Sequence, residues 1–387
     1  MPTGQHAVGK RCSGATGGGE SWGAADPAVR IRYARLALLR RVHERAGEHE
    51  ALSPGSSPAA VPRLGAHEPW RRGCELYARV SLGLLPNGGS LIVRGMKGLG
   101  DNIYQRAFVK RLQCPVYLET PWPELYEDLP GVKFVKAETP LRTQSKNMAL
   151  QDAGRWATAP RESVVTVQYG TAGIVTGMRR CFGVGPGEFD LPDFGPSPVS
   201  GRYMVVRPAT VRAEWVAEAR NPLTMYIAEA AEMAHAAGYR VISVADLEPG
   251  KEWAVGKLPP ADEVYHAGEF DVRQLMALVQ NSAAVIGGIG WVLPAAIAMK
   301  VPAWVICGGQ GGFNAPELIT DEKYMDLSRI RFAVPDNLCR CRHRQHNCDK
   351  RIKNHASDFA DWIRRLPDLV ARARNGVSSA SGDGLHD

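Results

Sequence analysis

The fold is decided by the stretch SLIVRGMKGLGDNIYQRAFVKRL at residues 90–112, which joins a β-rich run to a helical one. The run 90–94 predicts a buried strand, and residues 102–112 predict a helix. The glycines between them let the backbone turn tightly and approach a ligand closely. Free N–H groups at a helix start favour anions and acceptor oxygens, so this turn is a candidate ligand site.

The same alternation of strands and helices continues along the chain. It predicts an α/β protein with two doubly wound, Rossmann-like halves that face each other across a cleft, where ligands bind beyond the carboxyl ends of the strands. Residues 183–201 contain four Pro and five Gly and predict a linker between the halves. The predicted strands are 90–94, 115–119, 132–136, 164–169, 203–208, 239–246, 283–287 and 303–308, and the predicted helices are 102–112, 123–129, 171–182, 222–237, 271–280 and 292–299.

Composition narrows the class of protein. The 387 residues include 47 Lys and Arg against 40 Asp and Glu, a net charge of +7 that favours anionic partners. Eight cysteines without a secretory leader indicate a cytoplasmic protein rather than a disulfide scaffold. The apolar run 283–299 is shorter than the roughly 20 residues of a membrane span, so no transmembrane segment is expected.

The N-terminal region differs from the rest of the chain. Residues 1–26 are dominated by Gly, Ser, Ala and Thr and predict a disordered tail. Residues 28–46 predict a basic amphipathic helix, 48–69 a linker and 70–85 a second helix. The expected segments are an extension at 1–87, an acceptor domain at 88–190, a donor domain at 200–350, a C-terminal helix crossing back at 351–374 and a disordered tail at 375–387.

The first glycine turn carries the acceptor-side candidates. Asp101 stands at the predicted helix start, where it could cap the helix or act as a catalytic base. Lys97, Gly98, Gly100 and Asn102 surround it in sequence, and Lys97 could hold an anionic acceptor. The turn has neither the dinucleotide G-x-G-x-x-G spacing nor a complete P-loop, so the spacing alone does not define the ligand.

Arginines follow the first strand of the second half. Arg207 and Arg212 are expected to overhang the strand ends with the Thr210 hydroxyl. Guanidinium groups bind phosphate oxygens bidentately, so this set could bind a diphosphate, while solvated surface arginines are the alternative.

A second glycine turn follows the strand 283–287. Gly288, Gly290, Trp291 and Val292 lead into a predicted helix, a geometry that can hold phosphate on backbone amides. A further glycine cluster around Gln310 follows the next strand and is expected at the same rim.

These segments resemble glycosyltransferase family 9, the heptosyltransferase-like group with the GT-B fold. The likeness spans about residues 88–355 and is carried by the GLGD turn, by GEFDVRQLMALVQNSAAVIGGIG (268–290) and by AAIAMKVPAWVICG (295–308). It implies sugar transfer from a nucleotide-sugar donor with inversion and without a catalytic metal or other required cofactor, with Asp101 as the base on the acceptor hydroxyl.

The chain also departs from this family. The family's Asp-Thr-Gly and following His correspond here to Gly288-Ile289-Gly290 and Leu293. Its second-domain lysine before a Trp is absent in register, and Arg212, three residues before Trp215, is the nearest cation. The resemblance therefore does not specify the donor.

A cysteine-rich segment precedes the last predicted helix. Cys339, Cys341 and Cys348, with two histidines between them, could bind a structural zinc, and a disulfide or free thiols are the alternatives. Residues 339–353 also carry six Lys and Arg against one Asp, the densest positive patch in the sequence.

Two other functions stay open beside the transferase. One is a nucleic-acid-associated protein in which the basic segments 28–46 and 339–353 bind phosphates, and it is compatible with the transferase if the acceptor is a nucleic-acid base. The other is a GT-B module that binds nucleotide without catalysis, suggested by the altered donor turn. We rank the glycosyltransferase first, with an unidentified hydroxyl-bearing acceptor.

Overall fold

The computed structural model describes residues 90–160, 163–170 and 172–379, all within one compact unit, Leu64–Asp387. The tail, linker and helices expected before residue 90 lie outside the described residues, as does the end of the expected C-terminal tail. No helix in the described part of the chain is long and apolar enough to cross a membrane.

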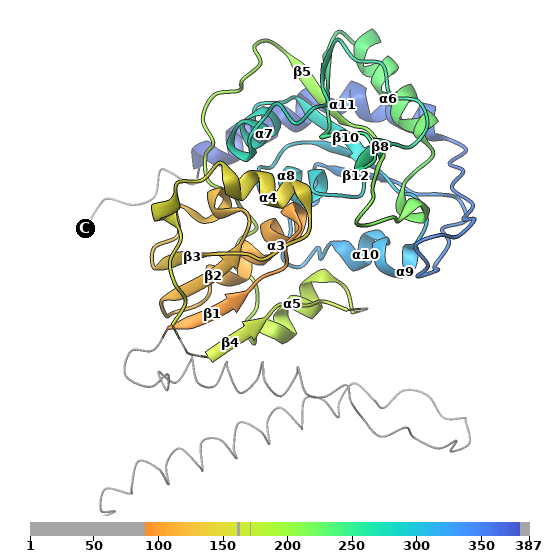
Figure 1. Cartoon of the computed structure of the whole chain (residues 1–387). Coiled ribbons are helices and arrows are strands. Elements are labelled where there is room, and N and C mark those ends of the chain that lie inside the picture. Colours follow the sequence, from red (N-terminus) through yellow and green to blue (C-terminus); the bar gives the residue numbers. More distant parts are fainter. Residues whose placement is uncertain (1–89, 161–162, 171, 380–387) are drawn as a thin grey trace, which may run out of the picture. The chain divides into compact units, whose positions relative to one another are not determined.

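The first half is built on a four-stranded parallel sheet with the order β3-β2-β1-β4 (Figure 1). Leu91, Val93 and Leu118 are fully buried, as expected for central strands of a parallel sheet with helices on its faces. Its elements are β1 (Leu91–Arg94), α3 (Leu99–Val109), β2 (Val116–Thr120), η2 (Pro123–Tyr126), β3 (Val132–Lys136), α4 (Arg142–Ala149), η3 (Ala153–Arg155), β4 (Ser163–Thr166) and α5 (Ile174–Phe182).

The second half contains a six-stranded parallel sheet with the order β12-β11-β10-β5-β7-β9, and a two-stranded antiparallel ribbon of β6 and β8. Its strands are β5 (Tyr203–Arg207), β6 (Thr210–Arg212), β7 (Arg240–Val244), β8 (Glu252–Ala254), β9 (Glu263–Tyr265), β10 (Ala284–Gly288), β11 (Ala303–Ile306) and β12 (Ile330–Ala333). Its helices are η4 (Glu218–Arg220), α6 (Thr224–Ala236), α7 (Val272–Gln280), α8 (Val292–Ala298), α9 (Gly311–Asn314), α10 (Pro316–Ile319) and α11 (His355–Ser379).

Both sheets have Rossmann-like strand orders, which confirms the predicted fold class. The order reverses between β1 and β4 in the first half and between β5 and β10 in the second. Such switch points are where doubly wound sheets bind ligands, because the following loops diverge there and leave a crevice. A ligand site is therefore expected among the residues that follow these four strands.

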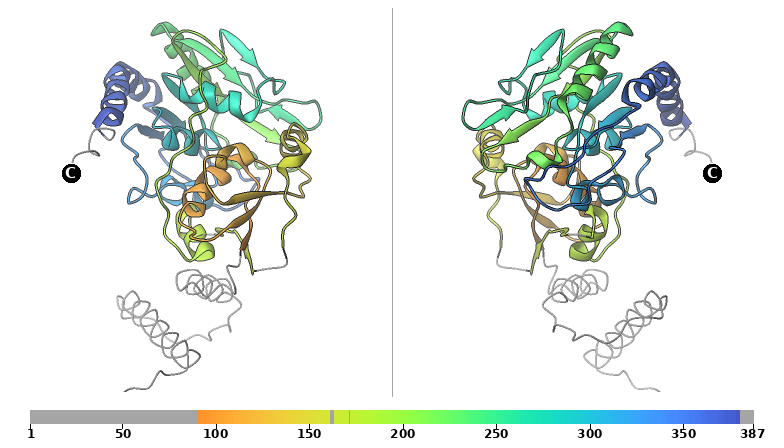
Figure 2. Two further views of the ribbon diagram at one scale, coloured as in Figure 1. Left: turned by 90° about the vertical axis from the view of Figure 1, so that its left-hand side faces the viewer. Right: turned by 90° about the vertical axis from the view of Figure 1, so that its right-hand side faces the viewer.

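The last helix packs on the second half. Phe359, Trp362 and Leu366 of α11 are buried in one apolar cluster with Trp304 of β11 and Tyr226 of α6. Figure 2 shows α11, in dark blue, beside the second half in both views. The expected crossing back to the first half stays a prediction, since the described side chains of α11 account only for this packing.

Candidate functional site

The glycine turn after β1 brings Asp101 into the first turn of α3. Gly98 is the N-cap and provides no side-chain hydrogen bond to the helix. α3 begins at Leu99, earlier than predicted, so Asp101 does not cap it. A Cβ on Gly98 would lie 2.4 Å from Asp101 Oδ2, which means that this glycine leaves room for the carboxylate. The capping interpretation is therefore wrong, and the role of base stays a prediction.

Asn102 holds the turn from inside the protein. Its Nδ2 donates to the carbonyls of Met96 (2.6 Å) and Gly98 (2.9 Å), and its Oδ1 accepts from Thr120 Oγ1 (2.8 Å). The Tyr126 hydroxyl lies 3.0 Å from the same Oδ1. Because Asn102 is fully buried, these contacts make it a residue that shapes the turn rather than one that an acceptor touches.

Lys97 lies on the outer side of the same turn. Its Nζ donates to the Glu138 carbonyl and lies 3.8 Å from the Glu119 carboxylate, while its own carbonyl accepts from Trp122 Nε1 at 2.9 Å. The Lys97 side chain is partly exposed, so it can still meet an anionic group.

Asp101 has an unusual electrostatic environment. Burial raises the pKa of its carboxyl to about 6, although the charge of Arg220 and a hydrogen bond from Tyr169 act in the opposite direction. Tyr169 follows β4 and Asp101 follows β1, so the two side chains meet at the switch point of the first sheet. A carboxyl with this pKa exchanges its proton near neutral pH.

The two halves meet directly at Asp101. A Cβ on Gly100 would lie 3.1 Å from the Trp291 Cα and 3.3 Å from Pro294 Cγ, so the start of α3 packs closely on the start of α8. Gly100 is therefore required for the close approach of α3 to the turn after β10, and the two predicted glycine turns form one site.

Arg220 is the cation of this site, and sequence analysis missed it. Its Nη2 donates to the Ile289 carbonyl at 2.7 Å, inside the turn after β10, and lies 3.7 Å from the position of a Cβ on Gly290. Burial lowers the pKa of Arg220 and the charge of Asp101 counteracts this. The sequence prediction placed the nearest cation at Arg212, before Trp215, whereas Arg220 follows Trp215 in η4.

Arg207, Thr210 and Arg212 converge on Glu252, whose side chain is 1% exposed. Arg207 Nη2 donates to Glu252 Oε1 at 3.2 Å, and the Thr210 hydroxyl donates to the same oxygen at 2.9 Å. Arg212 Nε lies 2.8 Å from Oε2 as an ion pair, without the angles of a hydrogen bond. Arg207 also borders Gly287 in the next strand, so it does lie at the second switch point.

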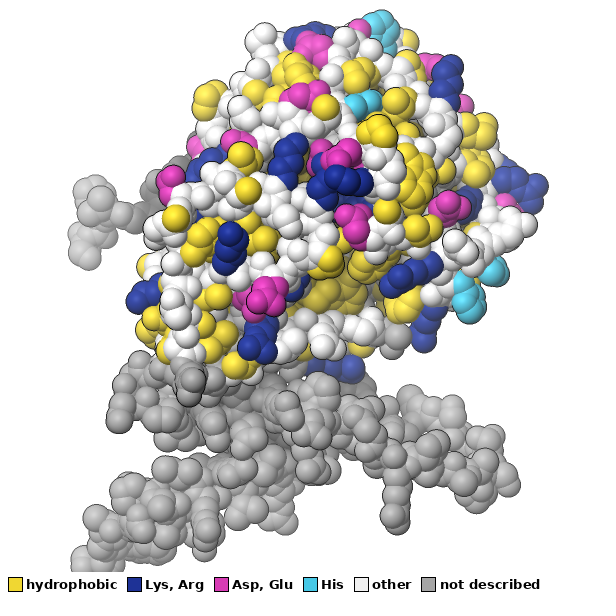
Figure 3. Space-filling view, in the orientation of Figure 1, with side chains coloured by type: hydrophobic (Ala, Val, Ile, Leu, Met, Phe, Trp, Pro, Cys, Tyr) yellow, Lys and Arg dark blue, Asp and Glu magenta, His cyan; other side chains and the backbone are white. Residues whose placement is uncertain are grey.

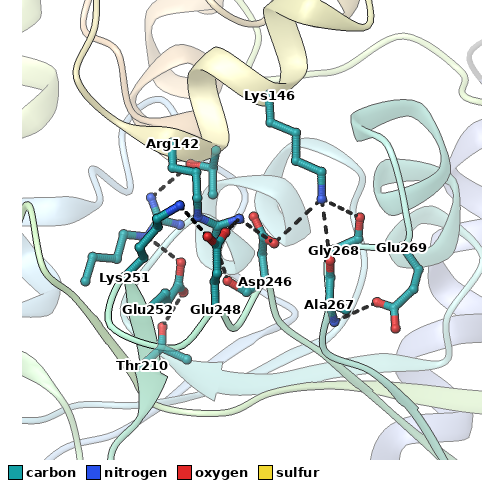
Figure 4. A network of polar contacts seen from close by, with 12 residues as sticks. Arg142, Lys146, Thr210, Asp246, Glu248, Lys251, Glu252, Ala267, Gly268 and Glu269 are labelled. Atoms are coloured by element: carbon teal, nitrogen blue, oxygen red, sulfur yellow. Dashed lines mark hydrogen bonds and ion pairs between the residues drawn. The ribbon is translucent and has the colours of Figure 1, made fainter.

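A network of charges links the halves on the side of α4 (Figure 4). Arg142 Nη1 lies 3.0 Å from both the Asp246 and the Glu248 carboxylates, and its Nη2 donates to the Asp246 carbonyl at 2.6 Å. Lys146 donates to the Gly268 carbonyl at 3.0 Å. Sequence analysis did not predict α4, so this network was found only in the folded protein.

Two cavities accompany these contacts. One, of about 540 Å³, is lined by residues of α5, α10 and β12, including Gly173, Leu318 and Phe332. The other lies over the network of Figure 4 and is lined by Arg142 and Asp246. Asp101 lines neither of these two cavities, and its side chain lies at the start of α3, where this helix packs on α8.

The cysteine-rich segment forms a cluster that could hold a metal ion. The Sγ atoms of Cys339, Cys341 and Cys348 and a ring nitrogen of His346 all lie within 4.8 Å of one another. The sulfurs of Cys341 and Cys348 are 3.6 Å apart, and His346 Nδ1 is 3.2 Å from Cys348 Sγ and 3.5 Å from Cys339 Sγ. Ligands about 2.3 Å from a tetrahedral zinc lie about 3.8 Å from each other, so the donor set fits such an ion. The sequence prediction named the three cysteines as ligands and counted His343 and His346 in the cluster, and the structure selects His346.

Gln310 belongs to this cluster. It has a φ of 58°, and its backbone N–H donates hydrogen bonds to the thiols of Cys341 and Cys348. Its side chain accepts from Asn314 Nδ2 at 2.9 Å. The structure therefore associates Gln310 with the cysteines, whereas sequence analysis expected it at the donor turn.

The glycines around Gln310 leave room for the same segment. The N–H of Gly311 donates to the Cys339 carbonyl (2.7 Å) and that of Gly312 to the Cys341 carbonyl (3.0 Å). A Cβ on Gly309 would lie 2.3 Å from Cys348 Sγ. Figure 3 shows histidine and basic side chains at the edge of the molecule where this segment runs in Figure 1.

No model of a known protein family matches the chain, and no curated protein matches it. Solved structures are similar to it at low identity. The iron-containing dodecameric glycosyltransferase TibC of enterotoxigenic Escherichia coli H10407 has 15% identity, with 73% of this chain and 79% of that chain covered and a TM-score of 0.47.

Two further structures are of the same kind. The ADP-heptose lipopolysaccharide heptosyltransferase II of E. coli has 14% identity, covering 73% of this chain and 99% of that one, with a TM-score of 0.42. A family 9 glycosyl transferase of Veillonella parvula has 10% identity, covering 74% and 98%, also with a TM-score of 0.42. The family that the sequence resembles is thus represented among them.

Proposed function

We propose that the protein is a glycosyltransferase that moves a sugar from a nucleotide-sugar donor to an acceptor hydroxyl with inversion. The observation that carries this proposal is the meeting of Asp101, with a pKa of about 6, and Arg220 where the switch points of both halves come together. A base from one half and a cation from the other are the two groups that such a transfer requires.

The reaction assigns one step to each group. The ionised Asp101 carboxylate removes the proton of the acceptor hydroxyl as its oxygen attacks the anomeric carbon. The bond from that carbon to the donor phosphate oxygen breaks on the opposite face, so the configuration inverts and the nucleoside diphosphate leaves with the electron pair. The hydrogen bond from Tyr169 orients the carboxylate.

We assign the leaving diphosphate to Arg220 and to the turn that contains Gly288, Gly290, Trp291 and Val292. The guanidinium supplies a positive charge beside this turn, and the backbone N–H groups at the start of α8 supply donors. No metal ion is needed at the reacting centre in this mechanism, so transfer should proceed without added Mg²⁺ or Mn²⁺.

A different role in donor binding is proposed for Arg207, Thr210 and Arg212. Their contacts with Glu252 mean that a phosphate must compete with a buried carboxylate to reach them. We therefore assign them to the wall of the donor site rather than to the leaving group. Lys97 remains the acceptor-side cation, on the outer side of the turn that carries Asp101.

We further propose that Cys339, Cys341, His346 and Cys348 hold one structural zinc ion. Three thiolates and one imidazole are a typical closed zinc site. The Gln310 backbone N–H, directed at the sulfurs of Cys341 and Cys348, would support these ligands from outside. Reduced thiols fit a cytoplasmic location. Elemental analysis of purified protein should find one zinc per chain, and an equivalent of another metal would overturn the assignment.

A thermal-shift screen with nucleoside diphosphates and nucleotide sugars tests the main proposal, because a ligand that binds only the native state raises the melting temperature. The donor found in this way is then incubated with candidate hydroxyl acceptors, using Asp101→Asn as the comparison. Transfer by the parent protein, with loss of transfer but retained nucleotide binding in the variant, supports the proposal. Equal transfer by the variant would disprove the base assignment.

The non-catalytic alternative is favoured by one observation. Gly288 and Leu293 replace the acidic and imidazole groups that the resembling family has in the donor turn. Nucleotide binding without turnover of any donor in the screen would support that alternative.

A further inference from the structure

The short helix η4 is held by three hydrogen bonds, two with the cysteine segment and one with Gly309 after β11. The Ala219 N–H donates to the Arg344 carbonyl at 3.0 Å, and the Gly309 N–H donates to the Ala219 carbonyl at 2.8 Å. Lys350 Nζ donates to the Glu218 carbonyl at 3.1 Å. Arg344 lies between the cluster residues in sequence, and Lys350 follows them closely, so η4 is attached to the cluster on two sides.

The helix η4 in turn ends in Arg220, whose side chain reaches the donor turn. Arg220 Nη2 donates to the Ile289 carbonyl at 2.7 Å. The path from cluster to donor turn therefore consists of one loop, one helical turn and one side chain. Each of these three parts contains only a few residues.

Two glycines remove the free space along this path. A Cβ on Gly309 would lie 2.3 Å from Cys348 Sγ and 2.7 Å from the Ala219 carbonyl oxygen. A Cβ on Gly308 would lie 2.2 Å from the Arg220 carbonyl oxygen. Since backbone lies against backbone here, a shift of the cysteine segment displaces η4 rather than being absorbed by side-chain rotation.

The cysteine segment has backbone hydrogen bonds from Gly311 and Gly312, and Arg344 lies over the Trp215 ring, but it has no regular secondary structure to order it. Arg342, His343 and Arg344 are exposed, and the segment contains neither helix nor strand. A metal ion would join four side chains that otherwise make only weak contacts through sulfur and a ring nitrogen. Binding free energy at such a site is folding free energy for the residues around it.

We propose that metal binding by Cys339, Cys341, His346 and Cys348 holds η4 in place and thereby positions Arg220 at the donor turn. The metal site is then a positioning element for nucleotide binding. Cys348 lies 128 residues after Arg220 in the sequence, and the two are connected only through the contacts named above. The consequence for nucleotide binding rests on the proposed function of Arg220, whereas the ordering of η4 does not.

Hydrogen exchange measured by mass spectrometry tests the ordering of η4 without reference to activity. The full-length protein is compared as purified and after removal of its metal with a chelator. Peptides that contain the amides of Ala219 and Gly309 should exchange about tenfold faster without metal, because local opening becomes easier. Peptides from β5 and β10 should not change, which shows that the fold is retained. Unchanged exchange at Ala219 and Gly309 would overturn the proposal.

Two variants keep the test decisive if metal removal unfolds the protein. Lys350→Met retains all four ligands but lacks the bond to the Glu218 carbonyl, and it should speed exchange in η4 by a smaller factor with metal content unchanged. Cys114→Ser removes a thiol outside the cluster and should leave exchange in η4 as in the parent. Equal exchange in Lys350→Met and the parent would contradict the attachment of η4.

Calorimetric titration with ADP, UDP and GDP then separates this inference from the proposed function. The diphosphate that binds the parent protein should bind about tenfold more weakly after metal removal, the loss expected for one charged hydrogen bond. Faster exchange in η4 with unchanged affinity would reject the role of Arg220 in nucleotide binding. Binding of none of the three by the parent would count against the proposed function, while hydrogen exchange would still decide whether the metal orders η4.

Discussion

Two clusters of arginine and carboxylate lie at the carboxyl ends of the strands, and they differ in how their charges are satisfied. Glu252 is buried and contacts two arginines and a hydroxyl from the same half of the protein. Asp101 faces Arg220 from the other half, and burial raises the pKa of its carboxyl to about 6. The comparison teaches that the same residue types can form a paired, buried cluster in one place and leave a carboxyl with a raised pKa in another.

The largest expected effect is on catalysis at Asp101. Asp101→Asn should lower kcat/KM by about a thousandfold, because it removes the proposed general base while preserving the shape of the side chain. Glu252→Gln, measured in the same transfer assay, should have a much smaller effect on kcat. A comparable loss of kcat in both variants would end the distinction between the two clusters.

The next largest effect is expected in the free energy of unfolding, and here Glu252 is the important residue. Glu252→Ala should lower the free energy of unfolding by about 3 kcal/mol, because it leaves buried Arg207 without its carboxylate. The measurement is urea denaturation followed by circular dichroism. The more exposed Glu248→Ala is the matched control and should cost less than about 1 kcal/mol.

A smaller effect is expected in nucleotide affinity. Arg220→Gln should weaken binding of the diphosphate about tenfold, because it removes a charged hydrogen-bond donor from the donor turn. Arg212→Gln should weaken it less, since Arg212 is already paired with Glu252. Calorimetry compares the two, and a greater loss in Arg212→Gln would reverse our assignment of the leaving-group cation.

The pH dependence of kcat/KM should reveal the raised pKa of Asp101. The carboxylate must be ionised to accept a proton, so kcat/KM should rise with pH through about 6. The hydrogen bond from Tyr169 lowers the pKa of Asp101, so Tyr169→Phe should move this rise to higher pH. A profile that does not move in the variant would show that Tyr169 does not act on the titrating group.

The smallest effect is expected from the network between the halves. Arg142→Gln removes ion pairs with Asp246 and Glu248 that are partly exposed to solvent. Such pairs contribute about 1 kcal/mol or less, and the loss should shrink further at high salt. Urea denaturation at low and high salt measures both differences.

Much of the fold was predictable from sequence. The strand at residues 132–136 was predicted at its observed bounds, and the buried strands β5, β10 and β11 were found within a few residues. These strands are apolar because both faces of a parallel sheet are covered. The edge strands β9 and β12 were missed, since short, half-exposed strands lack such a run. The helix α4 was missed because its sequence is mostly polar.

The candidate site was predictable only in part. The two glycine turns and Asp101 stand out because strand, glycine and helix signals follow each other in sequence. Arg220 and Tyr169 carry no such local signal, since they matter through contacts with residues far away in the chain. The contact of Gln310 with the cysteines was missed for the same reason, because the cysteine segment lies about thirty residues later.

The sequence by itself determined that this is an α/β protein of alternating strands and helices, with glycine turns after β1 and β10 and a cysteine-rich segment near its end. Those features follow from local periodicity and from the backbone freedom of glycine. Only the tertiary structure decided which charged groups pair, because pairing depends on distance and burial after folding. It brought Arg220 to Asp101, Glu252 to Arg207 and Arg212, and His346 to the three cysteines.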